Sequence, residues 1–415
     1  MHLGKHGERR RADVGAMREP EEHERPVPLQ VTRGQGAAVL VDEIERRQGA
    51  RRRQDRRILG LWRLRRPQLQ QHPGGNEAEH KRYNGEQAQP KCLACGHRHD
   101  YPTMTAAHSP FSRKPPAAPT VAQLVRFGTR EFEAAGLAFG HGTGDAQDDA
   151  AALVFHALHY DHADAAEMYD RRVDDAGLRR VLQLFAERLE RRVPAAYLMG
   201  RMWFAGLEFE VDERVIVPRS PFAELIRAGF TPWVDEAAVR RILDIGTGSG
   251  CIAIACAVRF PQAQVDAVDL SPGALEVASR NVARHGVEAR VQLHEGDVYR
   301  SLGAQRYDLI VSNPPYVSDE EMASLPDEYR HEPDLALRAG QDGLEVVRRI
   351  LREADAHLEP HGVLVVEVGD SEERLQQAYP GVPFVWLEFE HGGGGVFLLT
   401  KDELGRHRRE LLGDE

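Results

Sequence analysis

The sequence predicts an α/β protein whose main part, residues 219–405, is a doubly wound, Rossmann-like sheet that ends in an antiparallel hairpin. Three observations favour this fold. Short apolar runs alternate with segments of helical periodicity from residue 241 onward, which is the pattern of βαβ units. A glycine loop separates the first run from a helix, as in sheets that bind ligands at their carboxyl edge. The last two runs, 384–389 and 396–399, flank a glycine-rich turn, which predicts a closing hairpin.

Length and charge bound the class of protein. The chain has 415 residues, enough for two or three domains with a sizeable core. Residues 1–103 carry 21 Lys and Arg against 14 Asp and Glu, whereas residues 104–415 carry 33 against 51, a net charge of −18. An acidic surface argues against stable nucleic-acid binding and favours a basic protein partner. An acidic surface that is simply solvated and binds no partner explains the same net charge equally well.

Cysteine content and hydropathy bear on the compartment. Four cysteines in a chain of this size do not make a disulfide framework, and no apolar run approaches the roughly 18 residues of a membrane span. The charged N-terminus has no signal-peptide core. We therefore expect a cytoplasmic protein with no membrane partner. The sequence does not determine its oligomeric state.

Residues 1–103 show no sustained apolar periodicity, and we predict a disordered or non-native extension. The first convincing helix follows Met104 after a short proline-rich stretch, so Met104 is the expected native start. Within the extension, residues 92–99 contain two cysteines and two histidines in a zinc-like pattern. Four ligands within eight residues, with no domain around them, do not favour a folded metal site, and we predict no metal.

Residues 104–201 are predicted to form a small helical domain. Apolar residues recur at helical spacing near 121–132, 151–160 and 178–189, before Pro194 stops the last helix. These stripes indicate a core, and the domain is interpreted as a substrate-docking module or a structural cap.

Residues 202–218 are β-rich on both sides of Asp212 and Glu213, which predicts a linking hairpin. Ser220 then suits a helix N-cap and Pro221 the first helical position.

The next strand leads into Asp244-Ile245-Gly246-Thr247-Gly248-Ser249-Gly250 and a helix. Glycines let backbone approach a ligand closely, and the helix N-terminus offers free N–H groups. Cys251 stands where the dinucleotide fingerprint needs its last glycine, so NAD is the poorer match. A second strand ends on Asp269, which is placed to accept from two ribose hydroxyls. After a third strand at 289–294, Asp297 is placed to bind adenine or to cap a turn, and binding is favoured.

The fourth strand, 308–312, ends at Asn313-Pro314-Pro315-Tyr316. Two prolines donate no backbone N–H and restrict the preceding residue, so the Asn313 amide and the Pro314 carbonyl are held as two fixed acceptors. Such a pair suits a planar NH2 group, whose delocalised lone pair attacks poorly until its hydrogens are oriented. Taken alone, the motif fits an ordinary strand exit equally well.

The rest of the chain completes the sheet. Residues 329–333 are expected to form a loop that covers the site, 343–358 a helix, 362–369 a fifth strand and 406–415 a charged tail. His331 and His391 have no spacing that supports a catalytic role.

The combination of these motifs resembles the class I S-adenosyl-L-methionine-dependent methyltransferases that modify planar nitrogens. With the helical N-domain, the hairpin, Val217-Pro218-Arg219 and Arg330-His331-Glu332-Pro333, residues 118–405 resemble the protein-glutamine N5-methyltransferases. The version Arg219-Ser220-Pro221, with Trp386-Leu387-Glu388-Phe389, is similar to the branch that methylates a glutamine of large-subunit ribosomal protein L3. The release-factor branch often has Trp where this chain has Val298, which puts the adenine stacking contact in question.

The resemblance implies a role for each motif. Gly246 to Gly250 would hold the methionine part of S-adenosyl-L-methionine, Asp269 its ribose, and Asp297 with Val298 its adenine. Asp244 would belong to the same cofactor site. Asn313 would adjoin the cofactor and, with Pro314, accept from the glutamine NH2. Pro315, Tyr316, Arg219 and Glu332 would complete the substrate site, with Tyr316 packing on the amide.

Three alternatives remain at this stage. A release-factor glutamine methyltransferase would use the same chemistry. A methyltransferase acting on exocyclic amines of nucleic-acid bases shares the Asn-Pro-Pro-Tyr logic but is expected to carry a basic groove with aromatics, and none is evident in residues 104–415. A regulatory module that binds the cofactor without turnover is disfavoured by the intact motif.

Overall fold

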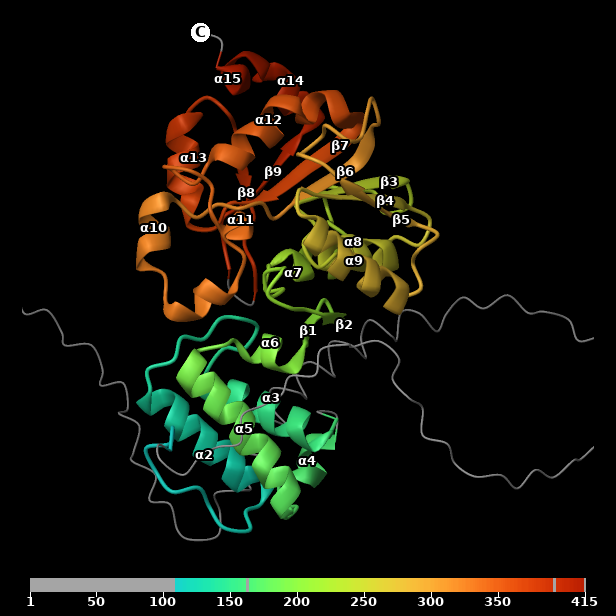
Figure 1. Cartoon of the computed structure of the whole chain (residues 1–415). Coiled ribbons are helices and arrows are strands. Elements are labelled where there is room, and N and C mark those ends of the chain that lie inside the picture. The colour runs from blue at the N-terminus through green and yellow to red at the C-terminus, as the bar shows by residue number, and fades with distance from the viewer. Residues whose placement is uncertain (1–108, 162–163, 391–392, 414–415) are drawn as a thin grey trace, which may run out of the picture. The chain divides into compact units, whose positions relative to one another are not determined.

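The computed structural model of the chain describes residues 109–161, 164–390 and 393–413 (Figure 1). Met104, the zinc-like residues 92–99 and His391 lie outside these ranges.

Helices form the part of the described chain before residue 200. Asp145 and Asp174 accept hydrogen bonds from first-turn backbone N–H groups, and Thr120 forms a capping box. The fully buried rings of Phe132 and Phe185 meet edge to face at 5.1 Å, so the first and third predicted helices share a core. All three predicted helices are confirmed, and the second begins earlier than expected because Asp145 caps it. The helices are α2 (Val121–Ala134), α3 (Ala146–Leu158), α4 (Ala165–Met168), α5 (Asp175–Arg191) and α6 (Ala195–Met199).

A two-stranded antiparallel hairpin follows, made of β1 (Arg201–Phe204) and β2 (Leu207–Glu210). Its turn is Ala205-Gly206, with φ angles of 51° and 88°, the signs that a two-residue hairpin turn requires. The predicted turn at Asp212 and Glu213 is therefore wrong. Asp212 binds the side chain of Arg214 instead, with oxygen–nitrogen distances of 2.9 and 2.7 Å.

The main sheet has the strand order β5-β4-β3-β6-β7-β9-β8. Neighbours from β5 to β7 are parallel, and β9 is antiparallel to both β7 and β8. The predicted doubly wound sheet with one reversed strand is confirmed. The strands are β3 (Arg241–Ile245), β4 (Gln264–Asp269), β5 (Val291–Glu295), β6 (Tyr307–Ser312), β7 (Leu358–Glu367), β8 (Val385–Trp386) and β9 (Val396–Thr400).

Both faces of the sheet are buried, because alternate residues of each strand enter different cores. One face packs on α7 (Phe222–Arg227), α8 (Cys251–Arg259) and α9 (Pro272–Arg284). The other packs on α12 (Glu345–His357), α13 (Glu372–Ala378), α14 (Lys401–Arg406) and α15 (Arg408–Leu412), as the orange and red ribbons of Figure 1 show.

Two predicted segments differ in the structure. The expected charged tail contains α15, whose Leu411 is buried in the second core. The expected loop at 329–333 begins inside the 3-10 turn η2 (Asp327–His331). This turn lies between α10 (Asp319–Ser324) and α11 (Asp334–Leu337). Ser318 starts this segment with a capping box.

Candidate active site

The predicted site residues gather at the carboxyl ends of the parallel strands. Ile245 of β3 lies opposite Ser312 of β6 in the sheet, and the Ser312 hydroxyl donates to the Ile245 carbonyl at 2.7 Å. The next residues, Gly246 and Asn313, therefore lie side by side. A Cβ atom on Gly246 would stand 3.8 Å from the Asn313 carbonyl oxygen, so the glycine loop and the Asn-Pro-Pro-Tyr motif face one another closely.

The glycine loop is held from inside by Asp244. The φ angles of the loop at Gly246, Gly248 and Gly250 are 73°, 56° and 80°, which glycine adopts without strain. One Asp244 oxygen accepts from the Thr247 hydroxyl at 2.7 Å and from the Ala253 amide at 3.1 Å. The other oxygen has no partner among the described residues. Because Asp244 is fully buried, its pKa is raised to about 7.

Asp269 joins the second strand to the same loop. Its carboxylate accepts from the backbone amides of Gly248 at 2.8 Å and Ser271 at 2.9 Å. Burial raises the pKa of Asp269 and outweighs these hydrogen bonds. The residue as a whole is partly exposed, and its carboxylate lies beside the loop.

Asp297 and Val298 lie beyond β5 in a different environment. The Asp297 carboxylate pairs with Arg349 and, at 3.4 Å, with Arg300. Val298 is buried in the core at a φ of 57°, a conformation that branched residues rarely adopt. Any ligand here would meet the backbone of Val298 rather than its side chain.

The Asn-Pro-Pro-Tyr segment combines a free amide with a fixed ring. The Asn313 side chain is partly exposed and makes no hydrogen bond within the described chain. Tyr316 is held at both ends, since its hydroxyl donates to Glu367 Oε1 at 3.1 Å and its carbonyl accepts from the Ser371 hydroxyl at 3.1 Å. Burial raises the pKa of Tyr316 well above its usual range. The hydroxyl therefore stays protonated and donates.

Arg219 and Glu332, predicted at the substrate site, bind one another. The two carboxylate oxygens of Glu332 accept from the Arg219 guanidinium at 2.5 and 2.8 Å, and the Val217 amide donates to Glu332 at 3.0 Å. Arg219 also lies over the Tyr329 ring, 5.6 Å from its centre. The two side chains thus form a bidentate pair.

His141 packs behind this pair from the helical part of the chain. Its ring lies 4.3 Å from that of Tyr329, and its Nε2 lies 3.8 Å from Glu332. Burial, helped by Arg219, lowers the pKa of His141 to about 4 despite the Glu332 charge. The histidine is therefore neutral at pH 7.

A second buried network ties η2 to the helical part. Glu328 accepts from the Ala138 amide at 2.9 Å, from Arg192 at 3.0 Å and from Arg188 at 3.5 Å. Arg188 also binds Asp149 at 2.7 Å. Burial opposes ionisation of Glu328, but these donors hold its pKa below the usual value.

Sequence reasoning missed Glu367 and assigned Ser220 incorrectly. Helix α7 begins at Phe222 with Pro221 as its cap, so Ser220 is not the N-cap and Pro221 not the first helical residue. The Ser220 hydroxyl donates to Glu367 Oε2 at 2.5 Å. The one signal in the sequence is an acidic residue at the end of the apolar run 363–366.

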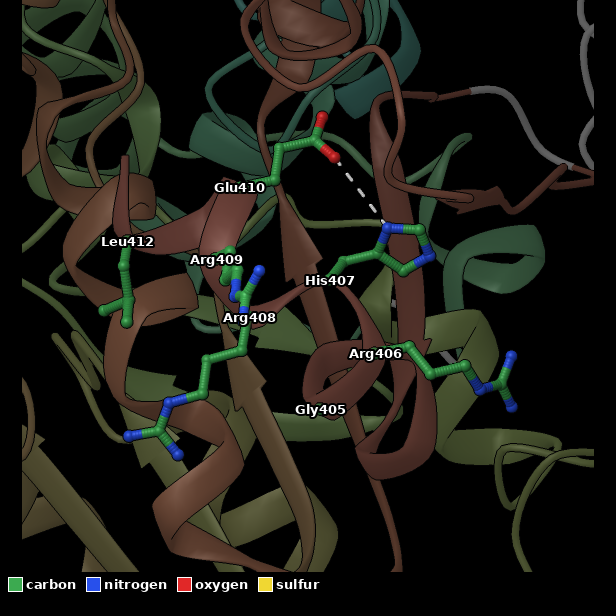
Figure 2. A pocket seen from close by; sticks show the side chains of 7 residues that line it. All are labelled: Gly405, Arg406, His407, Arg408, Arg409, Glu410 and Leu412. Carbon is green, nitrogen blue, oxygen red and sulfur yellow. Dashed lines mark ion pairs between the residues drawn. The ribbon is translucent and has the colours of Figure 1, made fainter. Parts of the chain in front are cut away.

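A separate hollow lies away from these residues, over α14 and α15. It has a volume of about 650 Å³ and is lined by residues 405–410 and Leu412. Figure 2 shows the ion pair between His407 and Glu410, 3.8 Å apart, at its edge. None of its lining residues belongs to the cluster at the sheet edge.

The fold and this edge define the class of protein. A family model described as Methyltransferase small domain matches residues 230–326, which include the glycine loop, Asp269 and the Asn-Pro-Pro-Tyr motif. The chain is thus a methyltransferase.

Within the described residues no helix is long and apolar enough to cross a membrane, and no group of His, Cys, Asp and Glu is arranged to hold a metal ion.

Sequence relatives narrow the class. The chain is 49% identical over 292 residues to the ribosomal protein uL3 glutamine methyltransferase of Xanthomonas campestris, covering 70% of this chain and 94% of that protein. The protein of the same name from Bordetella pertussis is 48% identical over 286 residues, covering 69% and 96%. That from Xylella fastidiosa is 49% identical over 293 residues, covering 70% and 93%. The chain belongs to the family of ribosomal protein uL3 glutamine methyltransferases.

Proposed function

We propose that this chain transfers a methyl group from S-adenosyl-L-methionine to the side-chain amide nitrogen, N5, of a glutamine in ribosomal protein uL3. The observation that carries the proposal is the free Asn313 amide beside the open glycine loop. Membership of the uL3 glutamine methyltransferase family supports the choice of substrate. A ribosomal substrate would place the reaction in the cytoplasm.

The loop geometry fits a nucleoside cofactor. A Cβ atom on Gly248 would meet nothing within 4 Å, and Gly246 is exposed, so backbone faces open space here. Residues 246–250 would hold the methionine part and Asp269 the ribose hydroxyls, with Asp244 fixing the loop from behind. Asp297 and the backbone of Val298 would border the adenine. The cofactor, when bound, supplies an electrophilic methyl group.

The protein's own task is to make an amide nitrogen nucleophilic. The lone pair of the glutamine NH2 is delocalised into its carbonyl, so nitrogen attacks poorly in the planar form. Asn313 Oδ1 and the Pro314 carbonyl would accept from the two N–H groups and aim the lone pair at the cofactor side, which is orientation with electrostatic preorganisation. Pro315 keeps the two acceptors rigid, and Tyr316 would pack on the amide. The proton then leaves to water.

The surroundings suit a basic protein segment. Residues 104–415 carry a net charge of −18. The exposed acids Asp319 and Glu320 follow the motif closely, and the exposed Asp327 comes after α10. Arg219 and Glu332 would line the entry as a pair, and the helical part of the chain would add a docking surface for uL3.

A labelled-methyl transfer assay tests the proposal. The purified chain is offered uL3, a peptide chain release factor and deproteinised ribosomal RNA in parallel, and the label is located by peptide mass. We expect label on one glutamine of uL3. Label on the release factor alone would keep the chemistry and overturn the substrate, whereas label on RNA alone would overturn the glutamine assignment.

A further inference from the structure

Glu367 lies directly behind Tyr316, at the last residue of β7, and only 5% of it is exposed. Its two carboxylate oxygens are divided between two hydroxyls. Oε1 accepts from Tyr316 at 3.1 Å and Oε2 accepts from Ser220 at 2.5 Å. The three residues come from β7, the segment after β6 and the segment before α7, so the carboxylate links three separate parts of the chain at the site.

We propose that Glu367 is a positioning residue for methyl transfer: held by Ser220, it fixes the Tyr316 ring against the acceptor amide. This inference rests on the proposed function. It adds two residues, Glu367 and Ser220, to the set that determines the rate, and neither of them touches the substrate.

Backbone packing restricts the Tyr316 ring in addition to this hydrogen bond. A Cβ atom on Gly369 would stand 2.6 Å from the ring, and one on Gly343 would stand 2.4 Å from the Tyr316 carbonyl oxygen. Backbone therefore packs directly on the ring and on its peptide, with no side chain between. Gly369 therefore packs on the ring, and the hydroxyl contact to Glu367 holds its outer end.

The charge on Glu367 is what makes the carboxylate a double acceptor. An ionised carboxylate accepts from both hydroxyls, whereas the protonated acid must use one oxygen as a donor. Burial raises the pKa of Glu367, against the lowering effect of Ser220, Tyr316 and the nearby Arg219 charge. Acidification therefore removes the double-acceptor state before it would affect an exposed glutamate.

The test compares Glu367→Gln, Tyr316→Phe and the double variant in the full chain. We expect each single change to lower kcat for uL3 by about 10- to 100-fold and to leave cofactor affinity within about threefold. If Glu367 acts through Tyr316, the double variant is no slower than the slower single variant. Glu359→Gln, at the other end of the same strand and partly exposed, is the matched control and keeps the parent rate.

A pH profile separates positioning from mere support of the fold. The acidic limb of kcat in the parent is expected to vanish in Glu367→Gln. In Ser220→Ala, which takes one donor from the carboxylate, the limb should move to higher pH, and this variant also serves if Glu367→Gln fails to fold. Parent kcat in Glu367→Gln, or a double variant whose loss is the product of the single losses, would overturn the inference. An inactive parent on uL3 would instead overturn the proposed function.

Discussion

The ionisation of Asp244, the buried carboxylate behind the glycine loop, makes the stability of the protein depend on pH. Its folded-state pKa of about 7 lies above the value of the unfolded chain, because burial disfavours the charged form. Its contribution to stability is therefore complete at acidic pH and is lost as the pH rises through 7.

Asp244→Asn should remove this dependence. Between about pH 5 and about pH 8 the free energy of unfolding of the parent should fall on the order of 3 kcal/mol more than that of the variant. Urea unfolding of both proteins without cofactor at the two pH values measures the difference. Parallel curves would mean that Asp244 titrates near its ordinary value.

At the residue scale, sequence patterns identified the site residues at the ends of strands. They missed residues that are far apart in the sequence but in contact in the fold. Gly246 and Asn313 follow strands of the parallel sheet and Asp269 ends one, so their gathering at one edge was predictable. Ser220 and Glu367 are 147 residues apart, and no local pattern pairs a serine near a helix start with an acid at the end of a strand.

At the scale of elements, the 3-10 turn η2 joins the helical part to the sheet part through a buried acid. Glu328 is fully buried and receives the Ala138 amide and two arginines, while its neighbour Asp327 is exposed. Of these two acids of η2, Glu328 is the one whose carboxylate is buried against its partners.

Glu328→Ala is expected to destabilise the protein by about 3–5 kcal/mol, because it leaves the fully buried Arg188 short of a partner. Asp327→Ala is the control, with an expected change below about 1 kcal/mol, because its ion pairs are exposed. Thermal or urea unfolding measures both. Equal losses in the two variants would show that the buried network contributes nothing beyond a surface pair.

The elements themselves were largely predictable, and the exceptions have physical causes. Hydrophobic periodicity located the main helices and strands. The linking hairpin turns at Ala205-Gly206, where two successive residues adopt positive φ. The polar pair Asp212-Glu213 misled the prediction, because Asp212 binds Arg214 instead. Helix α15 was missed because a single buried residue, Leu411, anchors an otherwise charged segment.

At the scale of the whole molecule, charge sets how a substrate arrives. With a net charge of −18 on residues 104–415, association with a basic protein should be steered electrostatically, and salt screens such steering.

Raising NaCl from about 50 to about 500 mM should lower kcat/KM for uL3 roughly tenfold. Cofactor affinity should change little, since it depends on short contacts. A short uncharged peptide carrying the target glutamine is the control and should show no such decline. An unchanged kcat/KM for uL3 would mean that the acidic surface plays no part in docking.

The strand order was the feature of the whole molecule that local patterns left open. Alternating strands and helices predicted a doubly wound sheet, and the placement of β3 between β4 and β6 follows from the crossover that puts Gly246 beside Asn313. That adjacency joins the cofactor loop and the acceptor residues into one site.

The most direct measurement on the central claim is single-turnover methyl transfer to uL3 by Asn313→Ala, with cofactor affinity measured by equilibrium binding. Glu353→Ala, exposed on α12, is the control and should behave as the parent. We predict a rate lower on the order of 100-fold or more and a nearly unchanged cofactor affinity, because one of two orienting acceptors is lost. Equal rates in Asn313→Ala and the parent would contradict the account.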